Sequence, residues 1–269
     1  MNILTALILS LTMSLGAGVK CSDAEMYFCD GFFGASLIET KIETVVYNSK
    51  DESEDREIPY GLPCYYYPGS YENTCANVAG AIVLGYYDKD YNELIAGFTS
   101  ARVIRDRVVY YPQTQAVQTT TEDLYVRMGT NTSAEGGTSV SGFKNGLTSY
   151  VTSKGRNISF TRVGGDKNAL ISSFASSRPV VMFVNRYVTT EIEEVATAGG
   201  KDTYNKQYYG GAHVLVAYGY KEIEYYDTSG ALIKSMTVLK VATGLGKERS
   251  YVFLDDFTQI ADGYAVDIY

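Results

Sequence analysis

The sequence predicts an α+β fold, with helices in the earlier part of the chain and an antiparallel sheet in the later part. Apolar residues recur at helical spacing in residues 73–88, 139–154 and 166–176. From residue 180 onward the chain instead contains short apolar runs of strand type. Helices and strands therefore occupy separate parts of the sequence instead of alternating, which is typical of α+β proteins and not of parallel α/β folds.

Each predicted helix has a start or stop signal of its own. Asn73 or Thr74 can cap the first helix, residues 91–98 either continue it or form a second short one, and Thr121 can cap a helix at 122–128. The turn-rich stretch 129–137 separates this region from the helix at 139–154. Pro179 ends the helix at 166–176.

The predicted strands follow one another with short connections. Residues 189–198 read as an insertion, and residues 227–230 (Asp-Thr-Ser-Gly) as a hairpin turn. The strands are predicted at residues 180–184, 213–220, 223–226, 231–242, 251–254 and 264–268.

Composition sets limits on the class of protein. The 269 residues are enough for one domain or two small ones, and the hydrophobic fraction of 45% indicates a sizeable core. A net charge of −8 argues against nucleic acid or an anionic membrane as the main partner. No cysteine or histidine spacing matches a zinc site, and we expect no metal and no other cofactor.

The beginning of the chain has features of a secretory signal. Residues 3–15 are almost wholly apolar and are followed by the small residues 16–18. The run is too short to span a bilayer comfortably, and Lys20 stands where a lipoprotein would have a small residue before Cys21. We therefore expect a signal peptide at 1–18, a secreted protein, and no stable membrane anchor after its removal. A buried N-terminal helix is the alternative.

Residues 19–57 are predicted to form a separate N-terminal segment, and the main domain begins at residue 58. Residues 39–47 read as one strand, whereas the acidic run at 51–57 is typical of a solvated loop or linker. The segment is either a propeptide or an edge element of the main domain. Export would permit disulfides, of which Cys21–Cys29 is the simplest, leaving Cys64 without a partner.

Cys75 lies in the first turn of the helix predicted at 73–88. The helix dipole there favours an anion, and therefore thiolate over thiol. Many small residues in this stretch suit a central helix that is packed from several sides. A structural role for Cys75, as a small apolar residue or in a disulfide with Cys64, is the alternative to a nucleophile.

His213 is the one histidine of the chain, 138 residues after Cys75 (213 − 75). It opens the apolar run 214–218 directly after Gly210, Gly211 and Ala212. We therefore expect the imidazole at the start of a strand, entered through a flexible turn, and so at one end of a sheet.

These residues resemble the papain-like cysteine peptidases, and more closely the bacterial branch of bacteriocin-processing and streptopain-like peptidases. In that family a cysteine begins a central helix, and a histidine follows roughly 130–150 residues later in the papain branch. The resemblance covers residues 59–269 and implies a papain-like domain at 58–269, with a central N-terminal helix bundle packed on a C-terminal antiparallel β-sheet. It also implies that Cys75 is the nucleophile, that His213 is the base and that the substrate is a peptide or protein. The matching residues are Cys75, residues 76–81, 84–87, 211–214 and 219–220.

Two expected members of the family's site are missing. Ala242 stands at the position of the asparagine that orients the histidine, so the third member of the triad is unassigned; Thr243, Asp227, a backbone carbonyl or water could orient His213. Gly69 stands at the position of the glutamine that stabilises the oxyanion. Asn73 is the candidate oxyanion donor, with a helix cap as its alternative role, and the backbone N–H of Cys75 would be a further donor.

Two functions are therefore predicted. The first is a secreted papain-like cysteine peptidase that uses a Cys75–His213 dyad, with the thiol and imidazole facing each other across a cleft at about 3–4.5 Å. The second is a catalytically inactive papain-like protein that acts as a surface-binding or interaction module. Transglutaminase- or amidase-type acyl transfer could use the same dyad. The sequence does not indicate how many copies of the chain associate.

Overall fold

The computed structural model describes residues 27–28, 35–97, 101–104, 107–110, 113–246 and 249–269. The predicted signal peptide at 1–18 and the predicted Cys21–Cys29 pair lie outside these residues.

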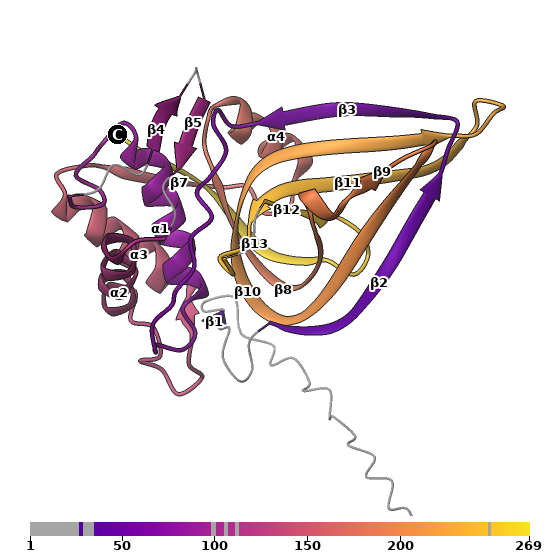
Figure 1. The fold of residues 1–269 in the computed structure, drawn as a ribbon. Coiled ribbons are helices and arrows are strands. Elements are labelled where there is room, and N and C mark those ends of the chain that lie inside the picture. Colours follow the sequence, from indigo (N-terminus) through magenta and orange to yellow (C-terminus); the bar gives the residue numbers. More distant parts are fainter. Residues whose placement is uncertain (1–26, 29–34, 98–100, 105–106, 111–112, 247–248) are drawn as a thin grey trace, which may run out of the picture.

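An antiparallel sheet of nine strands dominates the described part of the chain (Figure 1). Its strand order is β2-β10-β11-β12-β8-β13-β7, and β3 and β9 also pair with β10. Two small sheets, β1 with β6 and β4 with β5, lie apart from it. The strands are β1 Tyr27–Phe28, β2 Ser36–Val46, β3 Ser49–Glu57, β4 Ala101–Ile104, β5 Arg107–Tyr110, β6 Thr138–Ser139, β7 Ile158–Arg162, β8 Val180–Glu191, β9 Ala196–Thr197, β10 Lys201–Tyr226, β11 Leu232–Ala242, β12 Ser250–Phe253 and β13 Gln259–Ile268.

The helices are short and begin at the expected kinds of residue. Ser139 and Asp166, the first residues of two predicted helical stretches, cap α3 and α4 by accepting the backbone N–H three residues later. The cap predicted at Thr121 is wrong because α2 begins earlier, with Thr114 as its cap, and residues 91–98 form no helix in their described part. No described helix is long and apolar enough to cross a bilayer. The helices are α1 Cys75–Asp88, α2 Gln115–Arg127, α3 Val140–Ser153 and α4 Lys167–Ala175, with a 3-10 turn η1 at Ile192–Glu194.

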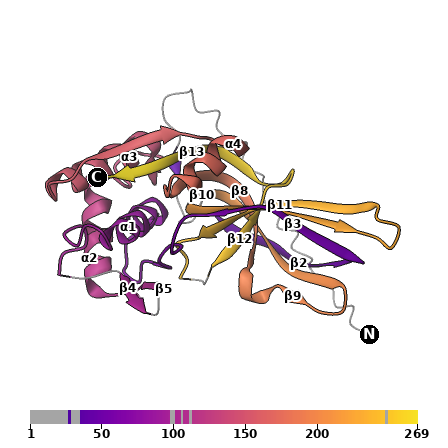
Figure 2. The same cartoon turned by 90° about the horizontal axis from the view of Figure 1, so that it is seen from above.

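The predicted architecture, a helix bundle packed on a C-terminal sheet, is wrong. Among the described residues, strands precede every helix, and the main sheet begins with β2 at residue 36 and continues with β3. Seen from above, α1, α2 and α3 lie at one side of the molecule, while β2, β3, β9 and β11 extend to the other side (Figure 2). The chain is therefore organised by its sheet, with four short helices in the described part.

Two segments caused this error because their strands are not apolar. The acidic run at 51–57 is part of β3 and not a loop, since its carboxylates lie beside lysines of neighbouring strands: Glu52 beside Lys221, and Asp55 and Glu57 beside Lys240. Residues 201–212, for which the sequence predicted no strand, form the first half of β10 and contain three tyrosines among polar residues.

The 26-residue strand β10 bends back on itself, and its two ends meet at the turn between β2 and β3. Tyr47 donates its backbone N–H to Gly200 (2.8 Å), next to the first residue of β10, and Asn48 donates to Tyr226 (2.8 Å), its last residue. β2 pairs along the first part of β10 and β3 along the last part. Figure 1 shows β2 and β10 curving together from the helices toward this turn.

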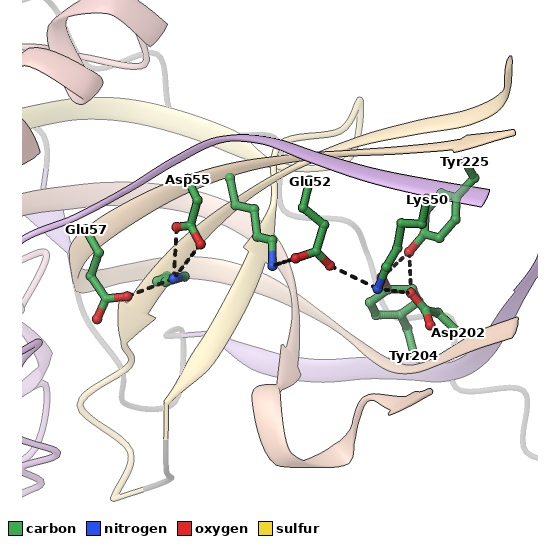
Figure 3. Close-up of polar contacts among 9 residues, drawn as sticks. Lys50, Glu52, Asp55, Glu57, Asp202, Tyr204 and Tyr225 are labelled. Carbon is green, nitrogen blue, oxygen red and sulfur yellow. Dashed lines mark hydrogen bonds and ion pairs between the residues drawn. The ribbon is translucent and has the colours of Figure 1, made fainter. Parts of the chain in front are cut away.

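A small second core fills the space between the arms of β10 and is closed by a polar network. Asp202 accepts hydrogen bonds from Lys50 (3.0 Å) and Tyr225 (2.9 Å), and the Tyr225 hydroxyl meets that of Tyr204 (Figure 3). Asp202 also accepts a hydrogen bond from Tyr47 (3.0 Å). Burial alone would raise the pKa of the Asp202 carboxyl, but these hydrogen bonds outweigh it and hold the pKa below its usual value. The apolar members are Val45, Val188, Tyr204, Ile223, Tyr225, Met236, Val238, Tyr251 and Phe253.

The main core surrounds α1, all of whose residues are buried. The small residues allow this close packing, as the sequence indicated. At Gly85, a Cβ atom would lie only 2.6 Å from the ring of Tyr65. Side chains of α2, α3, β8 and β10 complete the core. Cys75 therefore begins a central, fully buried helix.

Candidate functional site

Cys75 is the first residue of α1 and is buried, with 2% of its surface exposed. Neither Cys75 nor Cys64 is in a disulfide, so the Cys64–Cys75 bond that would exclude catalysis is not formed in the structure. The predicted side-chain cap is also absent: Thr74 is the N-cap residue but makes no capping hydrogen bond. Position at the helix start still exposes the thiol to the positive end of the helix dipole.

Asn73 is part of an amide network that holds the loop before Cys75. Its backbone is left-handed (φ 61°), and its Nδ2 donates to Oδ1 of Asn131 (2.6 Å). Asn131 in turn donates to the carbonyl of Glu72 (3.2 Å) and to the hydroxyl of Tyr125 (2.8 Å), and it accepts from the N–H of Gly137 (2.6 Å). The structure thus gives Asn73 a part in positioning this loop, and its role as oxyanion donor stays a prediction.

The first turn of α1 is attached to the same region by a buried asparagine. Asn77 donates to Oγ1 of Thr130 (3.0 Å), which pairs with Thr138 (2.7 Å). Sequence reasoning missed Asn77 and Asn131. The turn cluster at 129–137 was recognised, but no pattern in the sequence indicated which side chains it would meet.

His213 lies in the middle of β10 and not at the start of a strand, so that part of the prediction is wrong. The small residues before it form a bulge: the register with β8 shifts between Gly210 and His213, and Gly211 has φ 105°. Bulges re-aim the side chains that follow them. The flexible approach expected from the sequence is therefore a bulge within one continuous strand.

A backbone carbonyl orients the His213 ring. Nε2 lies 2.8 Å from the carbonyl oxygen of Thr243. Because a carbonyl only accepts hydrogen bonds, Nε2 carries the proton, and in the neutral ring Nδ1 then has an unprotonated lone pair. Asp227, the other side chain considered for this role, instead accepts from Ser229 and Ala231 within the hairpin turn.

One face of the imidazole is covered by Tyr187, which in turn stacks on Tyr209. Tyr187 of β8 stacks on His213 with ring centroids 5.5 Å apart and planes inclined by 18°. Tyr209 stacks on Tyr187 at 5.0 Å. His213 is only 1% exposed, and its Nδ1 has no hydrogen-bond partner among the described residues. Buried polar atoms are normally satisfied, but a few others here, such as the hydroxyls of Tyr65 and Tyr218, likewise have no hydrogen-bond partner among the described residues.

Burial lowers the pKa of His213 to about 4, and the hydrogen bond to Thr243 acts in the opposite direction without reversing this. The ring is therefore neutral at pH 7. A neutral imidazole can accept a proton from a thiol, which is the form a general base requires. Burial thus disfavours the imidazolium that a resting thiolate–imidazolium pair would need.

The loop that holds His213 contacts the face of α1 on which Cys75 lies. Gly244 follows Thr243, and a Cβ on Gly244 would be 3.3 Å from Cγ1 of Val78. Val78 is three residues after Cys75, and residues at this spacing share a helix face. The structure brings these two elements together. Nδ1 has no hydrogen-bond partner among the described residues, and the separation of about 3–4.5 Å between thiol and imidazole stays a prediction.

The two described surface cavities lie away from these residues. One of about 280 Å³ lies between α2 and α3, lined by residues such as Gln115, Thr119 and Tyr150. The other, of about 400 Å³, lies at the end of α1 and is lined by Tyr86, Tyr87 and Tyr269 among others. The structure describes no group of three or more His, Cys, Asp or Glu residues that could hold a metal ion.

Comparison with known proteins gives no further guidance. No family model, no curated protein and no solved structure matches the chain.

Proposed function

We propose that this chain is a cysteine-type peptidase in which Cys75 is the nucleophile and His213 is the general base. The proposal rests on the hydrogen bonding of the His213 ring. Its Nε2 is held by the Thr243 carbonyl, while its Nδ1 keeps a buried lone pair with no hydrogen-bond partner among the described residues. A histidine with a purely structural role would be expected to satisfy both nitrogens.

The proposed reaction uses groups with matching properties. His213 Nδ1 takes the proton from Cys75 Sγ as sulfur attacks the peptide carbonyl, and the same proton then passes to the leaving amine. Water, deprotonated by His213, hydrolyses the resulting thioester. The Thr243 carbonyl stabilises the imidazolium formed on the way, and the helix dipole stabilises the sulfur anion. The backbone N–H of Cys75 is the proposed oxyanion donor.

The alternative, a binding module without catalysis, is favoured by a different observation. Cys75 and His213 are almost fully buried, and neither lines the two described cavities. A peptide carbonyl must reach sulfur, so the peptidase requires the region around the site to open when substrate binds. Catalytic hydrogen bonds are often longer without substrate, and such an opening is compatible with catalysis.

Peptide hydrolysis by matched cysteine variants separates the two functions. Wild type, Cys75→Ala and Cys64→Ala would be compared on a broad peptide library, followed by mass spectrometry. Cys64 is the other described thiol and serves as the control. We expect wild type and Cys64→Ala to cleave the same bonds and Cys75→Ala to cleave none.

His213→Gln tests the base. Its amide can still donate to Thr243 but cannot accept a proton, so the rate should fall by about 10²–10⁴-fold. If wild type cleaves no peptide, or if Cys75→Ala still cleaves, the proposed peptidase is refuted and the binding module is the remaining proposal.

A further inference from the structure

The β2 edge, residues Ser36–Val46, is an exposed strand with one open side. Among the described residues, only β10 pairs with β2. Of its eleven residues only Glu43 and Val45 are not exposed. Ile38, Ile42 and Val46 are 60%, 75% and 69% exposed. Exposed edge strands template pairing with another chain, and proteins normally block them with charged side chains, proline, bulges or short length.

The β2 edge has a bulge near its start and three charged residues, so it can pair with another strand only where opposite charges meet. It contains no proline, and its one irregularity lies between Leu37 and Glu39, where the register with β10 shifts. From Glu39 to Val46 the ladder is regular. Because side chains alternate along a strand, Thr40 and Ile42 lie on one face there and Glu39 and Lys41 on the other. Glu39 and Lys41 form an exposed ion pair with each other (2.7 Å).

Charge allows few ways for this strand to pair with a second copy of itself. When two antiparallel copies are related by a two-fold axis, the numbers of paired residues have a constant sum. Because only every second residue directs its backbone N–H and C=O outward, paired residues must have the same parity, and the two-fold axis passes through one residue. An axis at Glu39 or at Lys41 would place like charges opposite each other. An axis at Thr40 instead places Glu39 opposite Lys41, twice.

The axis at Thr40 also suits the other residues of the edge. Thr40 meets Thr40, and Ile42 of each copy comes to the level of the exposed Ile38 of the other. An axis at Ile42 would place Lys41 opposite Glu43, but Glu43 already forms ion pairs with Lys206 and Lys234 within its own chain. The first register uses no charged group that is ion-paired with another strand, although Lys41 also lies 4.9 Å from the ring centroid of Tyr208 on β10.

We propose that the β2 edge is a homodimer interface, in which two copies pair antiparallel about Thr40 and join their sheets into one. The dimer is held by the backbone ladder and by two Glu39–Lys41 pairs, with Ile42 of each copy covered by the partner strand. This inference is independent of the proposed peptidase reaction, since it uses none of that site's residues.

Charge reversal tests the interface and its register together. Sedimentation velocity of the full chain over the micromolar range should show a reversible dimer. Glu39→Lys alone would place two lysines opposite each other in both pairs, and Lys41→Glu alone would place two glutamates opposite each other. Each should weaken the dimer about tenfold or more. Both positions are exposed, and circular dichroism checks that each variant is folded.

Mixing the variants provides the decisive control. In a mixture of the Glu39→Lys and Lys41→Glu chains, a heterodimer should form, because every charge at positions 39 and 41 of one chain then faces an opposite charge of the other. The double variant Glu39→Lys/Lys41→Glu swaps both charges in one chain and should form a homodimer again. A monomeric wild type would overturn the proposal. So would a dimer that Glu39→Lys leaves unchanged, because it would use another register or surface. Loss of the dimer only after deletion of residues 1–34 would assign the interface to that segment and also refute pairing through β2.

Discussion

Acidification should destabilise this protein through His213 by an amount that the structure sets. The pKa of His213 is about 4 in the folded protein and 6.5 in an unfolded chain. As the pH falls below about 6.5, the unfolded chain takes up a proton that the folded protein does not. His213 therefore contributes stability that is fully present above pH 6.5 and is lost between pH 6.5 and 4.

The size of the effect follows from linkage. Relative to pH 8, His213 should lower the free energy of unfolding by about 0.8 kcal/mol at pH 6 and about 2 kcal/mol at pH 5. The limit below pH 4 is about 3.4 kcal/mol, from 2.5 pKa units at 1.36 kcal/mol each. Other groups titrate in this range, so the absolute pH dependence of wild type does not isolate His213.

The variant His213→Gln isolates the contribution of His213 to the pH dependence of stability. His213→Gln can donate to the Thr243 carbonyl but does not titrate, and the carboxylates titrate equally in both proteins. Urea unfolding at pH 8, 6 and 5 would give the difference between wild type and variant at each pH. We expect that difference to change by the amounts above. A difference that stays flat from pH 8 to 5 would show an ordinary pKa for His213 and refute the reasoning.

The same group can be observed directly because the chain contains one histidine. With ¹⁵N-labelled histidine, the protein should give one pair of ring nitrogen signals. At pH 7 they should report a neutral ring with the proton on Nε2, as the hydrogen bond to Thr243 requires. An imidazolium at pH 7, or a proton on Nδ1, would contradict the assigned base form.

Two further substitutions test the packing that supports the sheet and the central helix. Tyr225→Phe leaves the buried Asp202 and Tyr204 each without one hydrogen bond and should lower the free energy of unfolding by about 1–3 kcal/mol, whereas Tyr226→Phe on the surface should change it little; equal effects would contradict the buried network. Gly85→Ala places a methyl 2.6 Å from the Tyr65 ring and should cost about 1–3 kcal/mol, more than Gly80→Ala, whose neighbours are flexible side-chain ends at 3.0 Å or more; urea unfolding that ranks them in reverse would refute this account of α1 packing.

The sequence predicted the elements whose local signals agree with their environment. Residues 139–154 and 166–176 form helices because Ser139 and Asp166 cap them and apolar residues repeat on one face. The helix at Cys75 was found for the second reason alone, since its expected cap is absent. The sheet was underestimated because β3 and the first half of β10 are stabilised by ion pairs and tyrosines instead of aliphatic residues.

Parts of the candidate site could not be predicted, because they depend on the backbone. Any residue has a carbonyl, so no residue type at position 243 would identify the group that orients His213. The bulge at residues 210–213 likewise depends on pairing with β8, which lies far from it in sequence. The sequence identified Cys75 and His213 as residues of interest, but not the strand environment of the imidazole.

His213 is positioned by packing on several sides, so the proposed peptidase reaction does not need an asparagine to orient the ring. The Thr243 carbonyl fixes Nε2, and Tyr187 covers one ring face. Before the ring, the bulge is constrained by β2, since a Cβ on Gly210 would lie 2.7 Å from the end of Ile38. Each contact removes a rotation that an isolated imidazole would have. Because backbone and aromatic contacts fix the ring, the proposed reaction requires no hydrogen-bonding side chain at position 242.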